Sequence, residues 1–278
     1  MQEKGTQCQD RQEKLCYIYL MSEDNFNSTA ITNGLNTRFI GQNVLYYPIL
    51  TSTMEIARQQ AIKKALEGTT VIAVRQTRGK GRLNRTWLSP EGNISMSIIL
   101  YPAKKHLPFL TILASLAVLH SIEDSTGLKC QLKWPNDVLI NGKKVSGILL
   151  ESQAKTDNVV YATIGFGINV NMKLKDYPEI TSIATSLSDE LGKTTSRLAL
   201  IRNLFTEVEE LYLKLQSGQS LLDEWQERLI TLGKNIRVRS GEAIFEGIAE
   251  SVAEDGGLLL RCSDGNLMKF MAGDVTLR

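Results

Sequence analysis

An Asn-Gly pair at residues 141–142 separates two runs of strand-forming residues, DVLI (137–140) and KKVSGILLES (143–152). Both residues of the pair tolerate positive φ angles, which a two-residue β-hairpin turn requires, so the two runs are predicted to pair as antiparallel strands. Further runs typical of strands occupy residues 44–50, 70–75, 93–100, 131–134 and 159–170. Because hairpins replace the regular βαβ repeat, the pattern favours an antiparallel or mixed sheet that carries helices, which is an α+β architecture.

Three stretches predict the helices that cover this sheet. Residues 52–55 spell a capping box, in which the Ser52 hydroxyl accepts from the Glu55 amide while Glu55 reaches back, and this helix is expected to end near Leu66. Residues 106–122 are apolar but fall short of the ~18–20 residues of a membrane span, so they predict a buried core helix. Residues 196–230 hold two more helical patterns.

The sequence pattern changes from helical to strand-like after Gly233. From there, short strand-like runs are separated by turns that contain glycine, which predicts a small β-barrel. The sequence therefore divides into a short leader or linker (1–43), a main domain (44–232) that holds the candidate catalytic residues, and a C-terminal barrel (233–278).

The charge balance excludes a histone-like polycation, since 32 Lys and Arg residues face 30 Asp and Glu residues. The four cysteines are widely spaced and form no Cys-x-x-Cys pair, which argues against a zinc site and favours a reducing compartment. The N-terminal region shows no signal-peptide pattern. Together these features predict a cytoplasmic protein without a membrane segment.

The segment RQTRGKGRLNRTW (75–87) carries the strongest chemical signal. It contains five cations and no acidic residue, and Gly79 and Gly81 alternate with the cations. Glycine allows the backbone to approach a ligand and expose its amides, while cations neutralise an anion, so a phosphate or carboxylate ligand is predicted. A solvated basic loop and a loop that touches nucleic acid are the alternatives that the spacing leaves open.

Two further candidates follow on predicted strands. In KWPND (133–137), a proline fixes the turn, and Asp137 is predicted to help hold a magnesium-bound phosphate, with an Asx turn as the structural alternative. Lys144 is predicted to share a strand face with Ser146 and to point into a cleft, although a lone strand lysine is usually solvated.

The segment GFGIN (165–169) places two glycines in a strand, with Asn169 at the strand end. This pattern indicates that another group approaches the strand backbone closely at these glycines, or that the glycines serve only to pack the strand. The common nucleotide motifs fail, because Leu187 stands where a Walker loop needs glycine and Asn84 stands where G-x-G-x-x-G needs its third glycine. No Ser-His-Asp or Cys-His grouping indicates a nucleophilic enzyme.

Taken in order, these motifs resemble those of the biotin–protein ligase family. The resemblance runs from about Asn43 to the C-terminus and rests on S-T (52–53), Q-T-R-G-K-G-R-x-x-R-x-W (76–87), K-W-P-N-D (133–137), K-x-x-G-I-L (144–149), G-F-G-I-N (165–169) and A-G-D-V-T-L-R (272–278). It implies a catalytic domain similar to that of class II aminoacyl-tRNA synthetases, a mixed sheet with helices, followed by a small SH3-like β-barrel.

The resemblance also implies roles for individual residues. Lys144, Arg82 and Lys80 would be catalytic, at the reacting carboxylate and phosphate oxygens. Biotin binding is implied for Ser52, Thr53, Met54, Gln76, Gly79, Lys80, Gly81, Arg82, Lys144 and Gly147. Binding of ATP and Mg²⁺ is implied for Arg85, Trp87, Asn136, Asp137 and Asn169, with Asp137 as the metal ligand. Two positions depart from the family pattern, because Met54 replaces a common asparagine and Asn84 replaces a glycine.

The implied activity is that of a biotin–[acetyl-CoA-carboxylase] ligase. Biotin would be activated by ATP, with Mg²⁺, as biotinyl-5′-AMP and transferred to a lysine of a biotin carboxyl carrier protein or domain. The loop at residues 77–86 is expected to be open or poorly ordered without biotin and to close over the ligand. Only residues 1–43 precede the resemblance, so a winged helix-turn-helix and DNA binding are not expected, and the chain is expected to be a monomer or homodimer.

Two alternative functions stay open on sequence grounds. A lipoate–protein ligase shares the implied catalytic fold and adenylation chemistry, and the polarity of the pocket distinguishes it from a biotin ligase. A non-enzymatic nucleic-acid-binding protein would use the basic loop and the small barrel, but the net charge of +2 disfavours it.

Overall fold

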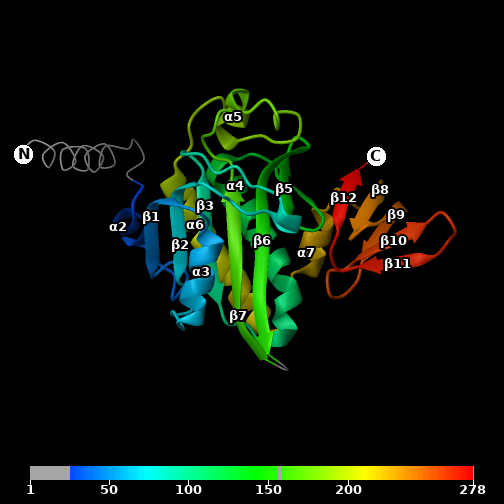
Figure 1. The fold of residues 1–278 in the computed structure, drawn as a ribbon, viewed down its shortest axis with the longest axis horizontal. Helices are drawn as coiled ribbons and strands as arrows, with labels where there is room; N and C mark the ends of the chain where they lie inside the picture. Colours follow the sequence, from blue (N-terminus) through cyan, green and yellow to red (C-terminus); the bar gives the residue numbers. More distant parts are fainter. Residues whose placement is uncertain (1–25, 156–157, 278) are drawn as a thin grey trace, which may run out of the picture.

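The computed structural model describes residues 26–155 and 158–277, so residues 1–25 of the predicted leader lie outside the described part. The larger sheet consists of β1 Val44–Leu50, β2 Thr70–Gln76, β3 Ile94–Leu100, β4 Gln131–Lys133, β5 Asp137–Ile140, β6 Lys143–Lys155 and β7 Asn158–Ile168. Its strands lie in the order β1-β2-β3-β7-β6-β5-β4 (Figure 1). β1 and β2 run parallel and the other neighbouring pairs are antiparallel, which confirms the predicted mixed sheet.

The hairpin between β5 and β6 is confirmed. Asn141 has a φ of 51° and Gly142 a φ of 76°, so both occupy the left-handed region that the turn requires. The turn starts β6 directly beside β5, and β6 then continues along β7 for the rest of its length.

Helices and short turns connect these strands. They are α2 Ser28–Thr32, α3 Thr53–Ile62, α4 Leu110–Thr126, α5 Leu187–Leu191, α6 Arg197–Gln216 and α7 Leu222–Glu227, with 3-10 turns η1 Arg82–Asn84, η2 Lys104–Phe109 and η3 Leu174–Asp176. In Figure 1, α3 lies in front of the large sheet and α6 behind it. The sheet is therefore covered on both faces.

The two faces of the sheet pack against different helices, because alternate strand residues point to opposite sides. Ile72 and Ile98 join the main core with side chains of α4 and α6. Val71 and Ile99 join a smaller cluster with side chains of α3. The main core thus lies on the α4 side of the sheet, and the smaller cluster lies on the α3 side.

The predicted core helix is confirmed in α4. Together with η2 it spans Lys104–Thr126, which is long and apolar enough by length and composition to cross a membrane. Its leucines at 113, 116 and 119 are completely buried in the main core. Gly127, with a left-handed φ of 73°, ends the helix. Burial inside the protein explains the apolar composition, so α4 is a core helix.

The predicted capping box at the start of α3 is wrong. Ser52 is the N-cap residue, but its side chain makes no capping hydrogen bond, and its buried hydroxyl has no partner among the described residues. Glu55 instead accepts a hydrogen bond from the Thr51 hydroxyl at 3.1 Å. The helix also ends before Leu66, because Lys64 adopts a left-handed φ of 61°.

Residues 26–43, which the sequence places in the leader, pack against the main domain. Phe26 and Ile40 join the main core. On α6, the buried carboxylate of Glu209 accepts the backbone amides of residues 38–40 at 2.6–3.0 Å. The helix in this segment is only five residues long, which is too short to show a helical period in the sequence.

A second, smaller sheet follows the main domain. It consists of β8 Asn235–Ser240, β9 Ala243–Val252, β10 Leu258–Cys262, β11 Leu267–Phe270 and β12 Asp274–Leu277. The strands are antiparallel in the order β11-β10-β9-β8-β12, and Figure 1 shows them beside α7. The predicted C-terminal unit of short strands is confirmed; β11 and β12 are its edges, and no pairing joins them within residues 235–277.

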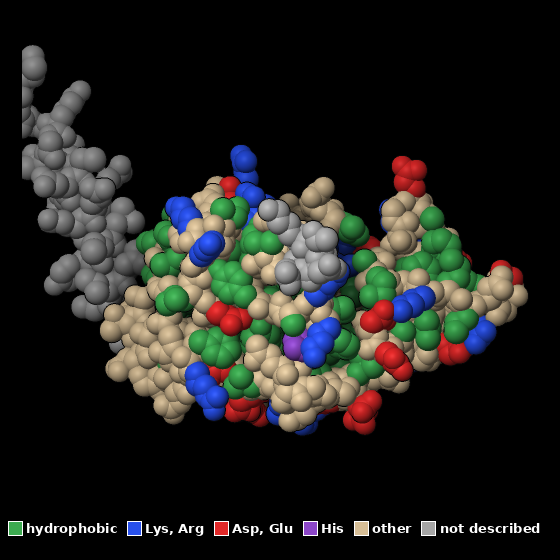
Figure 2. Space-filling view, turned by 90° about the horizontal axis from the view of Figure 1, so that it is seen from below, with side chains coloured by type: hydrophobic (Ala, Val, Ile, Leu, Met, Phe, Trp, Pro, Cys, Tyr) green, Lys and Arg blue, Asp and Glu red, His purple; other side chains and the backbone are tan. Residues whose placement is uncertain are grey.

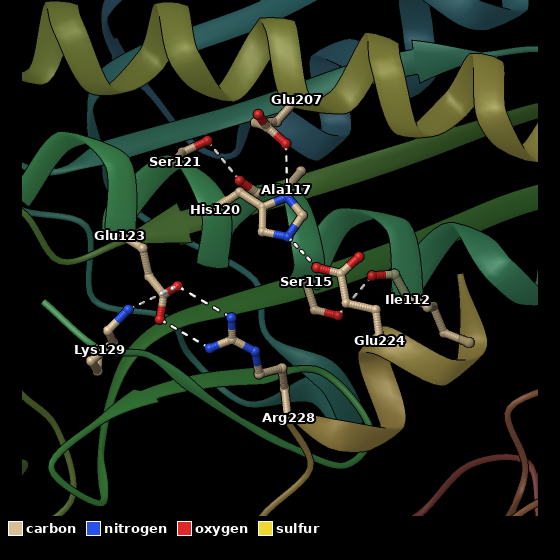
Figure 3. Close-up of polar contacts among 10 residues, drawn as sticks. All are labelled: Ile112, Ser115, Ala117, His120, Ser121, Glu123, Lys129, Glu207, Glu224 and Arg228. Carbon is tan, nitrogen blue, oxygen red and sulfur yellow. Dashed lines mark hydrogen bonds and ion pairs between the residues drawn. The ribbon is translucent and has the colours of Figure 1, made fainter. Parts of the chain in front are cut away.

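A polar cluster joins α4 to α6 and α7 (Figure 3). His120 Nδ1 lies 2.8 Å from Glu207, and its Nε2 lies 2.6 Å from Glu224. The hydrogen bond to Glu207 is the main cause that raises the pKa of His120 to about 9. One turn further along α4, Glu123 binds Arg228 at 3.1 Å. His120 therefore joins three helices as a structural residue.

Charges of both signs are mixed on the surface. On the face shown in Figure 2, Lys and Arg side chains lie among Asp and Glu side chains, with hydrophobic side chains between them. This distribution agrees with the net charge of +2. That face presents no large patch of a single sign to a polyanion.

Candidate active site

The α3 face of the large sheet has a floor of small residues. Ser95 of β3 pairs with Gly167 of β7, which pairs in turn with Gly147 of β6. Two residues away, Ser97 pairs with Gly165. Since their neighbours along β3 and β7 point into the main core, these serines and glycines face the opposite side.

Two large side chains lie directly on the glycines of this floor. A Cβ atom at Gly167 would sit 2.4 Å from the indole ring of Trp87, and one at Gly165 would sit 2.7 Å from Sδ of Met54. Any other residue would displace these side chains. The GFGIN segment is therefore closely approached by two of the protein's own side chains, and approach by a ligand stays a prediction.

One end of the floor is a polar network at the start of α3. Gln76 accepts hydrogen bonds from the backbone amide and the hydroxyl of Thr53 at 2.8 and 3.2 Å, and donates to the Ser89 hydroxyl at 2.7 Å. The Ser97 hydroxyl donates to Thr53 at 2.8 Å. Sequence reasoning missed Ser89, Ser95 and Ser97; the Ser-x-Ser spacing in a predicted strand is the signal that places the last two on one face.

Two hydroxyl groups beside this network have unused hydrogen-bonding capacity. Ser52 directly precedes Thr53, and Ser95 lies two residues from Ser97 on the same face. Both Oγ atoms are buried and have no hydrogen-bond partner within the described chain. A buried polar group without a partner costs about 1–3 kcal/mol, so a polar ligand that satisfies both hydroxyls would gain free energy.

The glycine-rich segment 77–87 folds into a compact loop beside the floor. An isolated β-bridge links Lys80 to Thr86, and the Trp87 amide donates to the Gly79 carbonyl at 2.9 Å. A Cβ atom at Gly79 would lie 2.3 Å from the Trp87 carbonyl oxygen. This glycine is therefore required for the loop to close on itself.

The tip of this loop turns through two residues with left-handed backbone conformation. Leu83 and Asn84 both have left-handed φ angles, 53° and 59°. Asparagine adopts this conformation more easily than most residues, so Asn84 is suited to the second position of this turn. Lys80 is exposed, so its ammonium group is accessible to a ligand.

Two arginines tie the loop to other parts of the molecule. Arg82 donates to Asn136 at 2.9 Å and to the Gly273 carbonyl at 3.3 Å. Burial is the main cause that lowers the pKa of Arg82. Arg85 forms an ion pair with Asp274, the first residue of β12. Of the predicted loop cations, Arg82 and Arg85 are thus held between the large sheet and the C-terminal sheet.

Lys144 meets the loop over the same floor. Its Nζ lies 2.6 Å from Oδ1 of Asp137 and 5.2 Å from the centroid of the Trp87 ring. The predicted face shared with Ser146 is wrong, because a β-bulge shifts the register of β6 at this point. Lys144 lies beside Gly147 instead, and Ser146 is buried with its hydroxyl bonded to the backbone at 2.8 Å.

The two predicted asparagines have structural partners. Asn136 donates to the Ile148 carbonyl at 2.7 Å while it accepts from Arg82. Asn169 is buried, and its amide donates to the Thr185 carbonyl at 3.0 Å. The structure therefore brings Asn136 to the loop and directs Asn169 toward the segment before α5. Their contact with ATP stays a prediction.

The acidic residues of the site suit a metal ion only in combination with a nucleotide. Within residues 26–155 and 158–277, no group of three or more His, Cys, Asp or Glu side chains is placed to hold a metal. Asp137 supplies one carboxylate, next to Lys144. Mg²⁺ in nucleotide sites is commonly held by one or two carboxylates together with phosphates and waters. The donor set fits a Mg²⁺ that binds with a nucleotide.

Two protein-family descriptions match the chain. Residues 46–169 match the Biotin/lipoate A/B protein ligase family, and residues 231–278 match the Biotin protein ligase C terminal domain. The first match contains the floor, the loop and Lys144, and the second contains Asp274.

Several named proteins and solved structures are similar to this chain. The bifunctional ligase/repressor BirA of Bacillus subtilis is 38% identical over 269 residues, covering 94% of this chain and 82% of that protein. The biotin–[acetyl-CoA-carboxylase] ligase of Paracoccus denitrificans is 33% identical over 208 residues, covering 69% of this chain and 83% of that protein. The structure of the biotin protein ligase from Aquifex aeolicus, in complex with biotin and ATP, superposes with a TM-score of 0.73 at 30% identity, covering 85% of this chain and 99% of that chain.

Proposed function

The chain belongs to the biotin protein ligase family, and we propose that it activates biotin with ATP and transfers it to a lysine of a carrier protein. Similar enzymes are named biotin–[acetyl-CoA-carboxylase] ligases. The C-terminal match is to a biotin ligase domain. These observations support biotin over lipoate as the substrate.

One observation carries the assignment of the substrate: the floor has an unsatisfied polar end and a cationic end. Biotin has matching chemistry, with a ureido ring that donates and accepts hydrogen bonds at one end and a carboxylate at the other. We place the ureido ring against Ser52, Thr53 and Gln76, where the buried hydroxyl of Ser52 needs a partner. The carboxylate then points toward Lys144 and Arg82.

In the first step, an oxygen of the biotin carboxylate attacks the α-phosphorus of ATP. A P–O bond forms, the bond to the β-phosphate breaks, and pyrophosphate leaves, giving biotinyl-5′-AMP. The main difficulty is the repulsion between two anions. Lys144, Arg82 and Lys80 offset that repulsion and stabilise the charge that develops on the α-phosphate oxygens.

Bound Mg²⁺ supplies charge neutralisation at the phosphates, and Asp137 is the residue that would hold it. The ion pair of Asp137 with Lys144 has a separate role, since it keeps the lysine ammonium over the floor at 2.6 Å from the carboxylate. Trp87 covers the adjoining glycines and limits the access of water to the reacting groups.

In the second step, the unprotonated ε-amine of a lysine on the acceptor attacks the acyl carbon of the adenylate. A C–N bond forms, the C–O bond to the phosphate breaks, AMP leaves, and the amine gives up a proton to solvent. We propose a biotin carboxyl carrier protein or domain as the acceptor. We also propose a cytoplasmic location, which the buried position of the apolar helix α4 supports.

The test is biotin-dependent exchange of labelled pyrophosphate into ATP by the purified chain. We expect exchange with biotin and Mg²⁺, and none when lipoate replaces biotin. A carrier domain should then receive biotin with the release of one AMP for each biotin transferred. The proposed function would be refuted if lipoate supported exchange and biotin did not, or if neither acid supported exchange.

A further inference from the structure

The C-terminal sheet reaches the active-site loop through one ion pair. At the start of β12, the Asp274 carboxylate accepts hydrogen bonds from both terminal nitrogens of Arg85, one of them at 3.1 Å. The preceding carbonyl, that of Gly273, accepts a hydrogen bond from Arg82. Two consecutive residues, Gly273 just before β12 and Asp274 at its start, therefore hold two arginines of the loop.

Asp274 is itself fixed in place by the sheet. It is paired with Arg239 of β8 in the antiparallel register, so its backbone belongs to a regular strand. The ion pair lowers the pKa of the Asp274 carboxyl and raises the pKa of Arg85, so each group favours the charged form of the other. Because the backbone of Asp274 is paired in the sheet, we take the strand as the fixed partner and the loop as the part that is positioned.

This ion pair is poorly suited to stabilising the whole fold. The Arg85 side chain is 61% exposed and that of Asp274 is 34% exposed, and exposed pairs of this kind contribute little to global stability. Its geometry is nevertheless bidentate, which fixes the orientation of a guanidinium group. The effect of the pair is therefore expected on the position of the loop.

The position of the loop decides where the catalytic groups lie. Arg82 contacts Asn136, whose neighbour Asp137 holds Lys144. At the other end of the loop, Trp87 rests on the floor beside the same lysine. A displaced loop would therefore move the cations that meet the two reacting anions.

We propose that Asp274 is a positioning residue for the adenylation step: through Arg85, it holds the glycine-rich loop of the catalytic domain in the geometry that the reaction requires. This inference rests on the proposed function for its kinetic readout. It assigns to the C-terminal sheet a direct part in the first chemical step.

The experiment compares Asp274→Asn with the wild-type chain in biotin-dependent pyrophosphate exchange. Asparagine has the same size but removes the charge and one acceptor oxygen. We expect kcat to fall about 10- to 100-fold, the range that a misplaced catalytic group produces. The KM for biotin should change much less, because the polar network around Gln76 is untouched. Asp274→Glu, which restores the carboxylate, should recover most of the lost rate.

The matched control is Glu250→Gln. Glu250 accepts two hydrogen bonds from Arg261, at 2.7 and 2.8 Å, between β9 and β10 of the same sheet. This variant removes an equivalent exposed pair that does not involve the loop, and its exchange rate should match that of the wild type. The midpoints of thermal unfolding of both variants should stay within about 4 °C of the wild type.

A second readout needs no catalysis: hydrogen–deuterium exchange of residues 77–86 in the absence of substrates. Faster exchange in Asp274→Asn, but not in Glu250→Gln, is expected. If the wild type lacked pyrophosphate exchange, the proposed function would fail. Hydrogen–deuterium exchange would still test whether the contact of Asp274 with Arg85 positions the loop. Unchanged loop exchange would overturn the inference even if activity fell, since Asp274 would then act by a route other than the position of the loop. Activity within twofold of the wild type would overturn it as well.

Discussion

Among single residues, Lys144 is the one to which we assign the most direct chemical role in the proposed reaction. Its ammonium group lies between Asp137 and the Trp87 ring, at the cationic end of the floor. We expect Lys144→Ala to lower biotin-dependent pyrophosphate exchange a hundredfold or more, the usual cost of losing a group that stabilises transition-state charge. Lys143→Ala is the control, because the neighbouring ammonium group donates to the Thr181 carbonyl at the surface. Equal activity of the two variants would remove Lys144 from the mechanism.

The sequence predicts candidate residues better than the direction of their side chains. It singled out the glycines at 165 and 167 from residue type and spacing, and Lys144 as catalytic only through the family resemblance; the roles of all three stay predictions. It placed Lys144 on a face with Ser146, because strict alternation holds only in a strand without a bulge. The bulge is defined by the register between β5 and β6, and the sequence of one strand does not specify how it pairs with another.

Between elements, His120 clamps α4 to α6 and α7 (Figure 3). Its pKa of about 9 in the folded state lies above the usual value of 6.5. The protonated His120 therefore contributes its full stabilisation to the folded state below about pH 6.5. This contribution is lost as the pH rises through about 9. We expect the free energy of unfolding in urea to fall by about 1–3 kcal/mol across this window. In His120→Gln the fall should be absent; an unchanged pH dependence would contradict the assignment.

Elements with strong local signals were predicted and those without them were not. The Asn-Gly turn and the apolar run of α4 were recognised because each is encoded within a few residues. The capping box failed at Ser52 because its hydroxyl is buried beside the polar network instead of bonded to its own helix. The segment at residues 26–43 was missed because its position depends on Glu209, far along the chain.

For the molecule as a whole, the loop at residues 77–86 should respond to substrates. It lies at the surface with exposed cations at Arg78, Lys80 and Arg85, and the proposed function gives it two anionic substrates to bind. We expect biotin together with ATP to slow tryptic cleavage at Arg78, Lys80 and Arg85 at least several-fold, because a loop closed over ligand is protected from protease. Cleavage at equal rates with and without both substrates would contradict this expectation.

The division into two units was visible in the sequence, but their contact was not. A change from helix-rich to strand-rich texture marks the C-terminal unit near Gly233. The ion pair between Arg85 and Asp274 joins residues 189 positions apart, and no local pattern encodes such a pairing. Tertiary structure therefore adds a link between two motifs that the sequence treats separately.

The indole of Trp87, seated on bare glycine backbone, gives this protein a built-in optical reporter. The other two tryptophans, Trp134 and Trp225, are each only 2% exposed and lie in the main core, where a soluble quencher has little access. Quenching of the intrinsic fluorescence by acrylamide will therefore respond chiefly to Trp87, the indole attached to the glycine-rich loop. Movements of that loop can be followed in the natural protein, with no added dye.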